Sequence, residues 1–83
     1  MIKMLTQENC AQCTALKNYL DLGLRGKYDE HIEIVKREDN PDEFNKLVEQ
    51  YSIMGTPALI GRDGNVLRNC TIGEVKGFLD SNI

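Results

Sequence analysis

Residues 1–36 alternate between extended and helical patterns, and this order constrains the fold more than any other feature of the chain. Residues 2–5 are a short apolar run, which predicts a mostly buried strand. From Cys10 to Leu24 apolar side chains recur every three or four positions, as in an amphipathic helix. Residues 31–36 alternate and are rich in β-branched side chains, so we expect a second strand that is parallel to the first across the helical crossover.

A second helix is predicted to begin after Asn40. An asparagine side chain can accept the free N–H bonds of a helix start, and Pro41 fits the first turn. Glu43 stands at the capping-box position, three residues after the cap. The apolar face of this helix consists of Phe44, Leu47, Val48 and Tyr51.

The remaining residues predict a hairpin and a third helix. Residues 58–60 and 66–67 are short apolar runs on either side of an Asp-Gly pair, which is typical of hairpin turns. Thr71 is expected to cap the last helix, with Glu74 as its capping-box partner. Two glycines each weaken this helix by about 1 kcal/mol relative to alanine, so docking has to hold it in place.

The order of elements predicts an α/β fold in one domain, residues 1–83. A βαβ half followed by a ββα half gives a four-stranded mixed sheet with about three helices on its faces. A chain of 83 residues suits one small domain, and its 41% hydrophobic and 28% charged residues are those of an ordinary globular protein.

Charge and cysteine content exclude several classes of function. The 10 Lys+Arg against 13 Asp+Glu leave a net charge of -3, so we expect no nucleic-acid partner. No segment has the length and hydropathy of a membrane span. Three cysteines are too few for the disulfide scaffold of a small secreted domain, and the first residues lack a secretory signal. We therefore expect the reducing cytoplasm.

The sequence Cys10-Ala11-Gln12-Cys13 stands where the first predicted strand passes into the first helix. A thiol at a helix N-terminus faces unpaired backbone N–H groups and the positive end of the helix dipole, which favour the thiolate. Cys10 is thus the expected nucleophile. Cys13 lies three residues later on the same face, where it can attack a mixed disulfide on Cys10 as the resolving thiol.

Other interpretations of the cysteines stay open. A C-x-x-C pair is also half of a zinc site, and His31 and Cys70 are the residues that could complete one, although their spacing matches no compact zinc motif. Cys70 is otherwise expected to be a small packing residue, and His31 a surface residue.

With Gly55-Thr56-Pro57 leading into a predicted strand, the chain resembles the thioredoxin superfamily, and most closely a small glutaredoxin. The resemblance covers essentially the whole chain. It implies that Pro57 is the cis-proline packed against the active-site disulfide and that Thr56 offers its backbone to a peptide or glutathione. Gln12 and Thr71 would complete this substrate-binding or glutathione-binding site.

The chain also departs from the glutaredoxin pattern. Its pair lacks the Pro-Tyr of dithiol glutaredoxins, and the basic residue that often precedes the first cysteine is replaced by Gln7, Glu8 and Asn9. The Gly-Gly-x-Asp element that holds glutathione is replaced by residues 68–74, in which only the helix start remains. The position of the buried acid of thioredoxins falls on Met4.

These observations and the resemblance predict a cytoplasmic, monomeric thiol-disulfide oxidoreductase that reduces protein or glutathione mixed disulfides through Cys10, with Cys13 resolving. It would need no metal or prosthetic group, and electrons would come from glutathione or a thioredoxin-type reductase. Disulfide-containing proteins are the expected partners, ribonucleotide reductase among the candidates. Two alternatives are a non-catalytic peptide-binding module and a C-x-x-C metal-binding protein. Arg37, Arg62 and Lys17 are candidate partners for substrate carboxylates.

Overall fold

The computed structural model describes residues 1–83. The elements in chain order are β1 (Ile2–Thr6), α1 (Ala11–Asn18), a π-helical turn (Tyr19–Gly23), a 3-10 turn (Asp29–His31), β2 (Ile32–Lys36), α2 (Pro41–Tyr51), β3 (Ala58–Ile60), β4 (Val66–Leu67) and α3 (Ile72–Ser81). The predicted order of strands and helices is confirmed. His31 lies in the 3-10 turn, so the second strand begins one residue later than the sequence pattern suggests.

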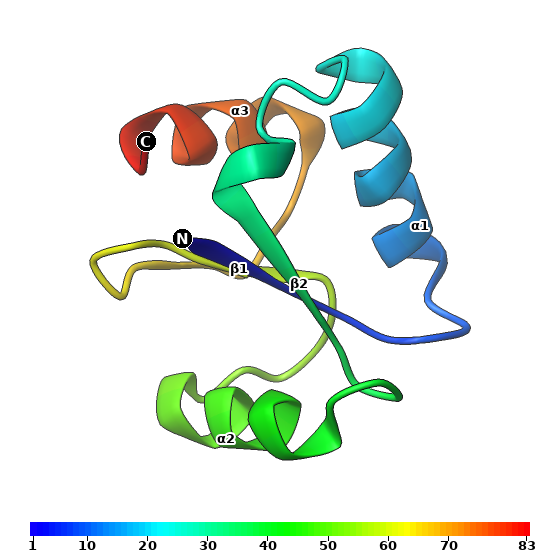
Figure 1. The fold of residues 1–83 in the computed structure, drawn as a ribbon, viewed down its shortest axis with the longest axis vertical. Helices are drawn as coiled ribbons and strands as arrows, with labels where there is room; N and C mark the ends of the chain where they lie inside the picture. Colours follow the sequence, from blue (N-terminus) through cyan, green and yellow to red (C-terminus); the bar gives the residue numbers. More distant parts are fainter.

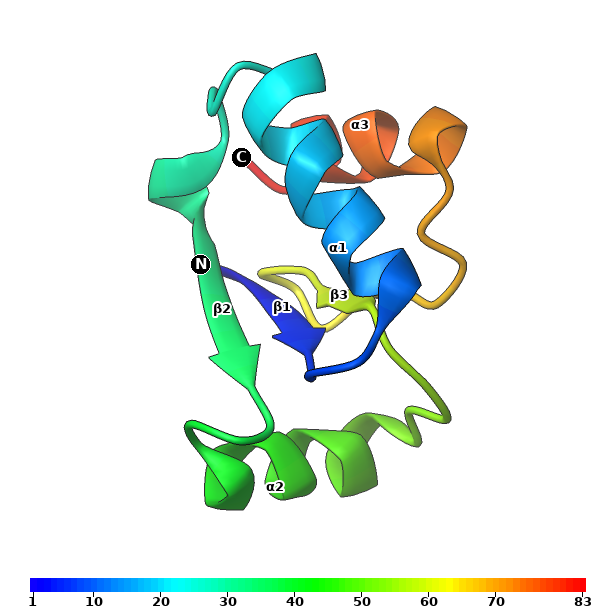
Figure 2. The ribbon, with the colours of Figure 1, turned by 90° about the vertical axis from the view of Figure 1, so that its right-hand side faces the viewer.

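The four strands form one mixed sheet in the order β2-β1-β3-β4. β1 and β2 are parallel, whereas β3 is antiparallel to both β1 and β4. Helices α1 and α3 cover one face of the sheet and α2 covers the other (Figures 1 and 2). The predicted α/β class and four-stranded mixed sheet are therefore confirmed.

Alternation along β1 divides the core into two layers. Ile2 and Met4 are fully buried and face α1 and α3, whereas Leu5 is fully buried on the α2 side. The first layer also contains Leu16, Leu20, Tyr28, Leu59, Val75 and Leu79, and the second Val35, Phe44, Leu47, Ile53, Ala58 and Ile60. Both layers bury side chains from the central strands, which fixes the sheet between the helices.

Helix α2 begins as the sequence predicts. The Asn40 side chain accepts a hydrogen bond from the Glu43 backbone N–H at 3.5 Å and donates one to the Glu43 carboxylate at 3.1 Å, with Pro41 in the first turn. At the other end, the Arg68 guanidinium donates to two backbone carbonyls near the helix C-terminus. These bonds satisfy carbonyls that have no partner within the helix.

The first helix widens in its last turn, which the apolar spacing did not predict. The Leu24 N–H donates to the Tyr19 carbonyl, five residues back, at 2.9 Å. The Tyr19 ring lies over Gly23, where a Cβ would come within 2.6 Å of the ring. Glycine at this position lets the aromatic ring lie against the helix backbone.

Helix α3 is held by docking, as expected from its glycines: Val75 and Leu79 are fully buried. Thr71 is the N-cap residue of α3, as predicted, but the predicted side-chain cap is wrong, because its side chain makes no capping hydrogen bond. Thr71 is extended, and its backbone carbonyl accepts from the Glu74 and Val75 N–H groups. Thr71 is one of the residues that line a surface groove.

Candidate functional site

Cys10 is the N-cap residue of α1, and its sulfur accepts a hydrogen bond from the Cys13 backbone N–H at 3.1 Å. The chain reaches this position through Asn9, whose left-handed φ of 56° turns it out of β1 and into the helix. No acidic residue stands in the first turn of α1. The helix dipole and the free N–H groups therefore act on the Cys10 sulfur without an opposing carboxylate in that turn.

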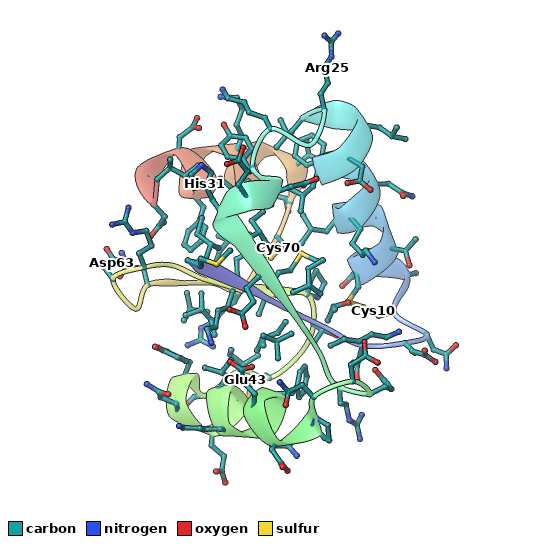
Figure 3. The ribbon with its side chains drawn as sticks, in the orientation of Figure 1. Cys10, Arg25, His31, Glu43, Asp63 and Cys70 are labelled. Carbon is teal, nitrogen blue, oxygen red and sulfur yellow. A yellow bond between two sulfur atoms is a disulfide. The ribbon has the colours of Figure 1, made fainter.

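Cys10 and Cys13 form a disulfide, with their Cα atoms 5.2 Å apart. The two residues differ in access: Cys13 is only 2% exposed, whereas Cys10 is half-buried at the N-terminal end of α1 (Figure 3). A sulfur that must meet a second molecule needs to be reachable. This difference in exposure favours Cys10 as the attacking thiol and Cys13 as the resolving thiol.

Thr56 lies directly against Cys10 of the disulfide, and Pro57 follows it in the chain. The Thr56–Pro57 bond is cis, as the resemblance implied. The Cys10 sulfur is 3.5 Å from the Thr56 hydroxyl and 3.7 Å from its carbonyl oxygen. The structure thus brings together Cys10, Cys13, Thr56 and Pro57, although they come from two segments far apart in the sequence.

A groove of about 470 Å³ extends from this point between α1, residues 53–57 and the start of α3. All four predicted substrate-binding residues line it: Gln12, Thr56, Pro57 and Thr71. Two residues that the sequence analysis missed give the groove an apolar rim: Met54 is 97% exposed and Ile72 67% exposed. Exposed apolar side chains at the edge of a groove are typical of surfaces that bind apolar groups of a partner.

Arg68 is the one charged residue that lines the groove. Its guanidinium donates to the Tyr51 carbonyl at 2.7 Å and the Ser52 carbonyl at 3.0 Å, so both of its terminal NH₂ groups are already hydrogen-bonded. The predicted carboxylate partners Arg37, Arg62 and Lys17 are not among the lining residues. The groove is accordingly poor in cations that are free to bind a carboxylate.

The loop before Cys10 carries one acidic residue, and its charge is paired. Glu8 forms an ion pair with Lys36 at 3.0 Å, and this hydrogen bond raises the pKa of Lys36. Gln7 lies beside the site, since its amide nitrogen donates to the Thr56 hydroxyl at 2.9 Å. Nothing in the sequence indicates that Gln7 contacts Thr56, because the two residues are 49 positions apart.

Cys70 is partly buried and packs against the core layer below α1 and α3, in line with its predicted packing role. Its thiol is 3.5 Å from the carbonyl oxygens of Pro57 and Leu67, to which it can donate. Burial raises the pKa of this thiol to about 11. Cys70 is therefore a neutral thiol at pH 7, unlike a reactive cysteine.

No three His, Cys, Asp or Glu side chains gather in a way that could hold a metal ion. His31 is exposed on the 3-10 turn before β2. Figure 3 shows Cys10, His31 and Cys70 apart from one another. None of the helices has the length and apolar character that a membrane-spanning segment requires.

Comparison with solved structures gives the class of fold. The crystal structure of the thioredoxin-like protein BC3987 matches with a TM-score of 0.68 and 22% sequence identity, over 94% of this chain and 99% of that one. Neither the protein-family models nor the curated protein sequences match this chain. The chain has a thioredoxin-like fold, and the Cys10–Cys13 pair at the start of α1 fits a redox protein.

Proposed function

We propose that this protein is a glutaredoxin-like thiol-disulfide oxidoreductase. The observation that carries the proposal is the placement of Cys10: a half-buried sulfur at a helix N-terminus, beside Thr56, with a buried Cys13 one turn away. A reachable thiol in such a place is activated, and a second thiol on the same helix can resolve the intermediate.

The reaction needs two exchange steps. The Cys10 thiolate attacks one sulfur of a substrate disulfide, forms a mixed disulfide with it and releases the other sulfur as a thiolate, which takes up a proton. The Cys13 thiol loses its proton, and its sulfur attacks Cys10, which releases the second substrate thiol. The substrate gains two electrons, and the protein is left with the Cys10–Cys13 disulfide found here.

The reduced pair is restored by two thiols from glutathione or by the dithiol of a thioredoxin-type reductase. The groove favours disulfides within extended protein segments: its rim is apolar at Met54 and Ile72, and the Arg68 guanidinium is engaged with backbone carbonyls. Gln12 and Thr71 line the same groove as polar contacts for the substrate backbone. Glutathione mixed disulfides are the second substrate class within this proposal.

The wider proposal is a cytoplasmic monomer that works without a metal or prosthetic group on disulfide-containing client proteins, with ribonucleotide reductase as one candidate. The net charge of -3, without an excess of basic residues, supports protein clients over nucleic acids. A covalently trapped client would identify the partner directly.

Replacing the attacking sulfur tests the proposal. Cys10→Ser is expected to abolish reduction of a model protein disulfide by dithiothreitol above the uncatalysed rate. Cys13→Ser should accumulate a mixed disulfide at Cys10, visible by intact mass. Cys70→Ser is the matched control and should keep full turnover, because Cys70 is a partly buried neutral thiol. Turnover that survives in Cys10→Ser would overturn the assignment.

The exposed rim supports a second candidate, a non-catalytic peptide-binding module. Such a module keeps its affinity for an extended peptide when Cys10 and Cys13 are both serine. An oxidoreductase loses covalent trapping in the same variant. A metal-binding protein would instead yield about one equivalent of metal when purified without chelators.

A further inference from the structure

Four side chains from three segments form a continuous row of polar contacts that ends at the Cys10 sulfur. The Arg37 guanidinium donates to the Gln7 side-chain carbonyl at 3.3 Å, and the Gln7 amide nitrogen donates to the Thr56 hydroxyl at 2.9 Å. The Thr56 hydroxyl oxygen lies 3.5 Å from the Cys10 sulfur. The row thus joins a positive charge at the end of β2 to the candidate nucleophile.

The direction of each bond follows from the chemistry of its donor. A guanidinium has only N–H donors, so the group that Gln7 turns toward Arg37 must be its carbonyl oxygen. The Gln7 NH₂ group then faces Thr56 and occupies a lone pair of the hydroxyl oxygen. The hydroxyl proton is left free to point at the Cys10 sulfur.

The strand pairing explains why Gln7 and Arg37 meet. In the parallel pair of β1 and β2, Thr6 lies opposite Lys36. The Arg37 backbone N–H donates to the Thr6 carbonyl at 3.0 Å and continues this register past the strand ends. Gln7 and Arg37 directly follow the two strands, so the strand pairing places them side by side.

We propose that Gln7 and Arg37 are positioning residues that keep the Thr56 hydroxyl donating to the Cys10 sulfur and thereby favour its thiolate form. This inference rests on the proposed role of Cys10 as nucleophile. A thiolate accepts a hydrogen bond from the hydroxyl and from the Cys13 N–H, and the guanidinium polarises the row from its far end. Through its contact with Gln7, Arg37 brings a positive charge toward Cys10, although residues 7–9 contain no basic side chain.

The other ionisable groups around the site do not supply a positive charge that reaches the Cys10 sulfur. Glu8 in the loop before Cys10 is paired with Lys36, and Glu38 accepts a hydrogen bond from the Glu8 backbone N–H. Residues 52–57 carry no ionisable side chain, and the first turn of α1 carries no acid. On the groove side, Cys70 is a neutral thiol, and the Arg68 guanidinium is hydrogen-bonded to backbone carbonyls at the end of α2. Arg37 is the cation that reaches Cys10 through hydrogen bonds.

The test measures the acidity of the Cys10 thiol in a Cys13→Ser background, where no disulfide can form within the pair. The pH dependence of Cys10 alkylation, followed by peptide mass, gives the thiolate fraction of this residue alone. Gln7→Leu is expected to lower the thiolate fraction at a fixed pH below the pKa by about three- to tenfold, because the Thr56 hydroxyl loses the contact that orients it and its hydrogen bond to the thiolate weakens. Arg37→Met should lower it in the same direction.

Three further variants separate the contact row from other effects. Arg37→Lys keeps a charged donor and should retain most of the thiolate. Gln7→Glu keeps the side-chain shape but has only acceptor atoms when ionised, so the Thr56 proton turns toward it and the thiolate fraction falls. Arg25→Met removes an equal charge from an exposed site that Figure 3 shows far from Cys10, and should leave the fraction unchanged.

The inference is overturned if Gln7→Leu and Arg37→Met titrate like the parent, or if Arg25→Met shifts the profile as much as Arg37→Met does. The second result would assign the effect to net charge at long range. Failure of the proposed function is a separate outcome, because it would appear as a Cys10 and Cys13 pair that never cycles between disulfide and dithiol. The alkylation profile of Cys10 is measurable in either case.

Discussion

Gly77 lies in the middle of α3, on its solvent-exposed face, and a Cβ added there meets no atom within 4 Å. Replacing it by alanine therefore changes only the intrinsic helix preference of the chain and the freedom of its unfolded state. Glycine in a helix interior costs about 1 kcal/mol relative to alanine. Gly77→Ala is expected to raise the free energy of unfolding by about this amount.

For a domain of this size, about 1 kcal/mol corresponds to a rise in Tm of roughly 4–8 °C. Urea denaturation followed by circular dichroism gives the free energy of unfolding, and a thermal scan gives Tm. Gly77 does not line the groove, so the redox behaviour of Cys10 and Cys13 should stay unchanged. A loss of stability, or no change, would contradict the helical, unobstructed position of Gly77.

Gly61 provides the matched control with the opposite sign. A Cβ there would overlap the Asn82 side-chain carbonyl, whose carbon is 2.8 Å away. Asn82 would have to move, which breaks its bonds to the Arg62 N–H at 3.1 Å and the Phe78 carbonyl at 2.8 Å. Gly61→Ala is expected to lower the free energy of unfolding by about 1–3 kcal/mol.

Two further substitutions test other parts of the structure. Because burial raises the pKa of Cys70 from 9.0 to about 11, the stability that this thiol contributes is present below pH 9 and is lost as the pH rises toward 11. Urea denaturation at pH 8 and pH 10.5 should show a smaller loss in Cys70→Ala than in the parent; equal losses would contradict the burial of the thiol. Asn40→Ala removes the cap of α2 and should lower the free energy of unfolding by about 1 kcal/mol, whereas an unchanged value would mean that the cap bond is not formed in solution.

Most of the fold is predictable from local sequence patterns. The spacing of apolar residues located β1, β2 and the three helices, and the hairpin turn located β3 and β4. The widened turn at Tyr19 is not predictable in this way, because it depends on how an aromatic ring meets Gly23. The side-chain cap expected at Thr71 is not formed either, because the sequence marks the helix start but not where the side chain points.

The candidate site was predictable in its cysteine pair and in four residues that line the groove, but not in the polar contacts around them. The C-x-x-C spacing marks Cys10 and Cys13, and a proline before a strand marks Pro57. The contacts of Gln7 with Thr56 and Arg37 join residues 49 and 30 positions apart, and they arise only once the sheet has formed. Arg68 was likewise hidden, since its carbonyl partners lie at the end of a helix elsewhere in the chain.

The most direct test of the central claim is a redox titration of the purified protein in glutathione buffers, with free thiols trapped by alkylation and counted by intact mass. We predict the reversible loss of two thiols, mapped to Cys10 and Cys13, at a midpoint of about −200 to −270 mV, with Cys70 still a thiol. A pair that stays reduced across the whole range, or that holds a metal ion, would contradict the assignment of an oxidoreductase.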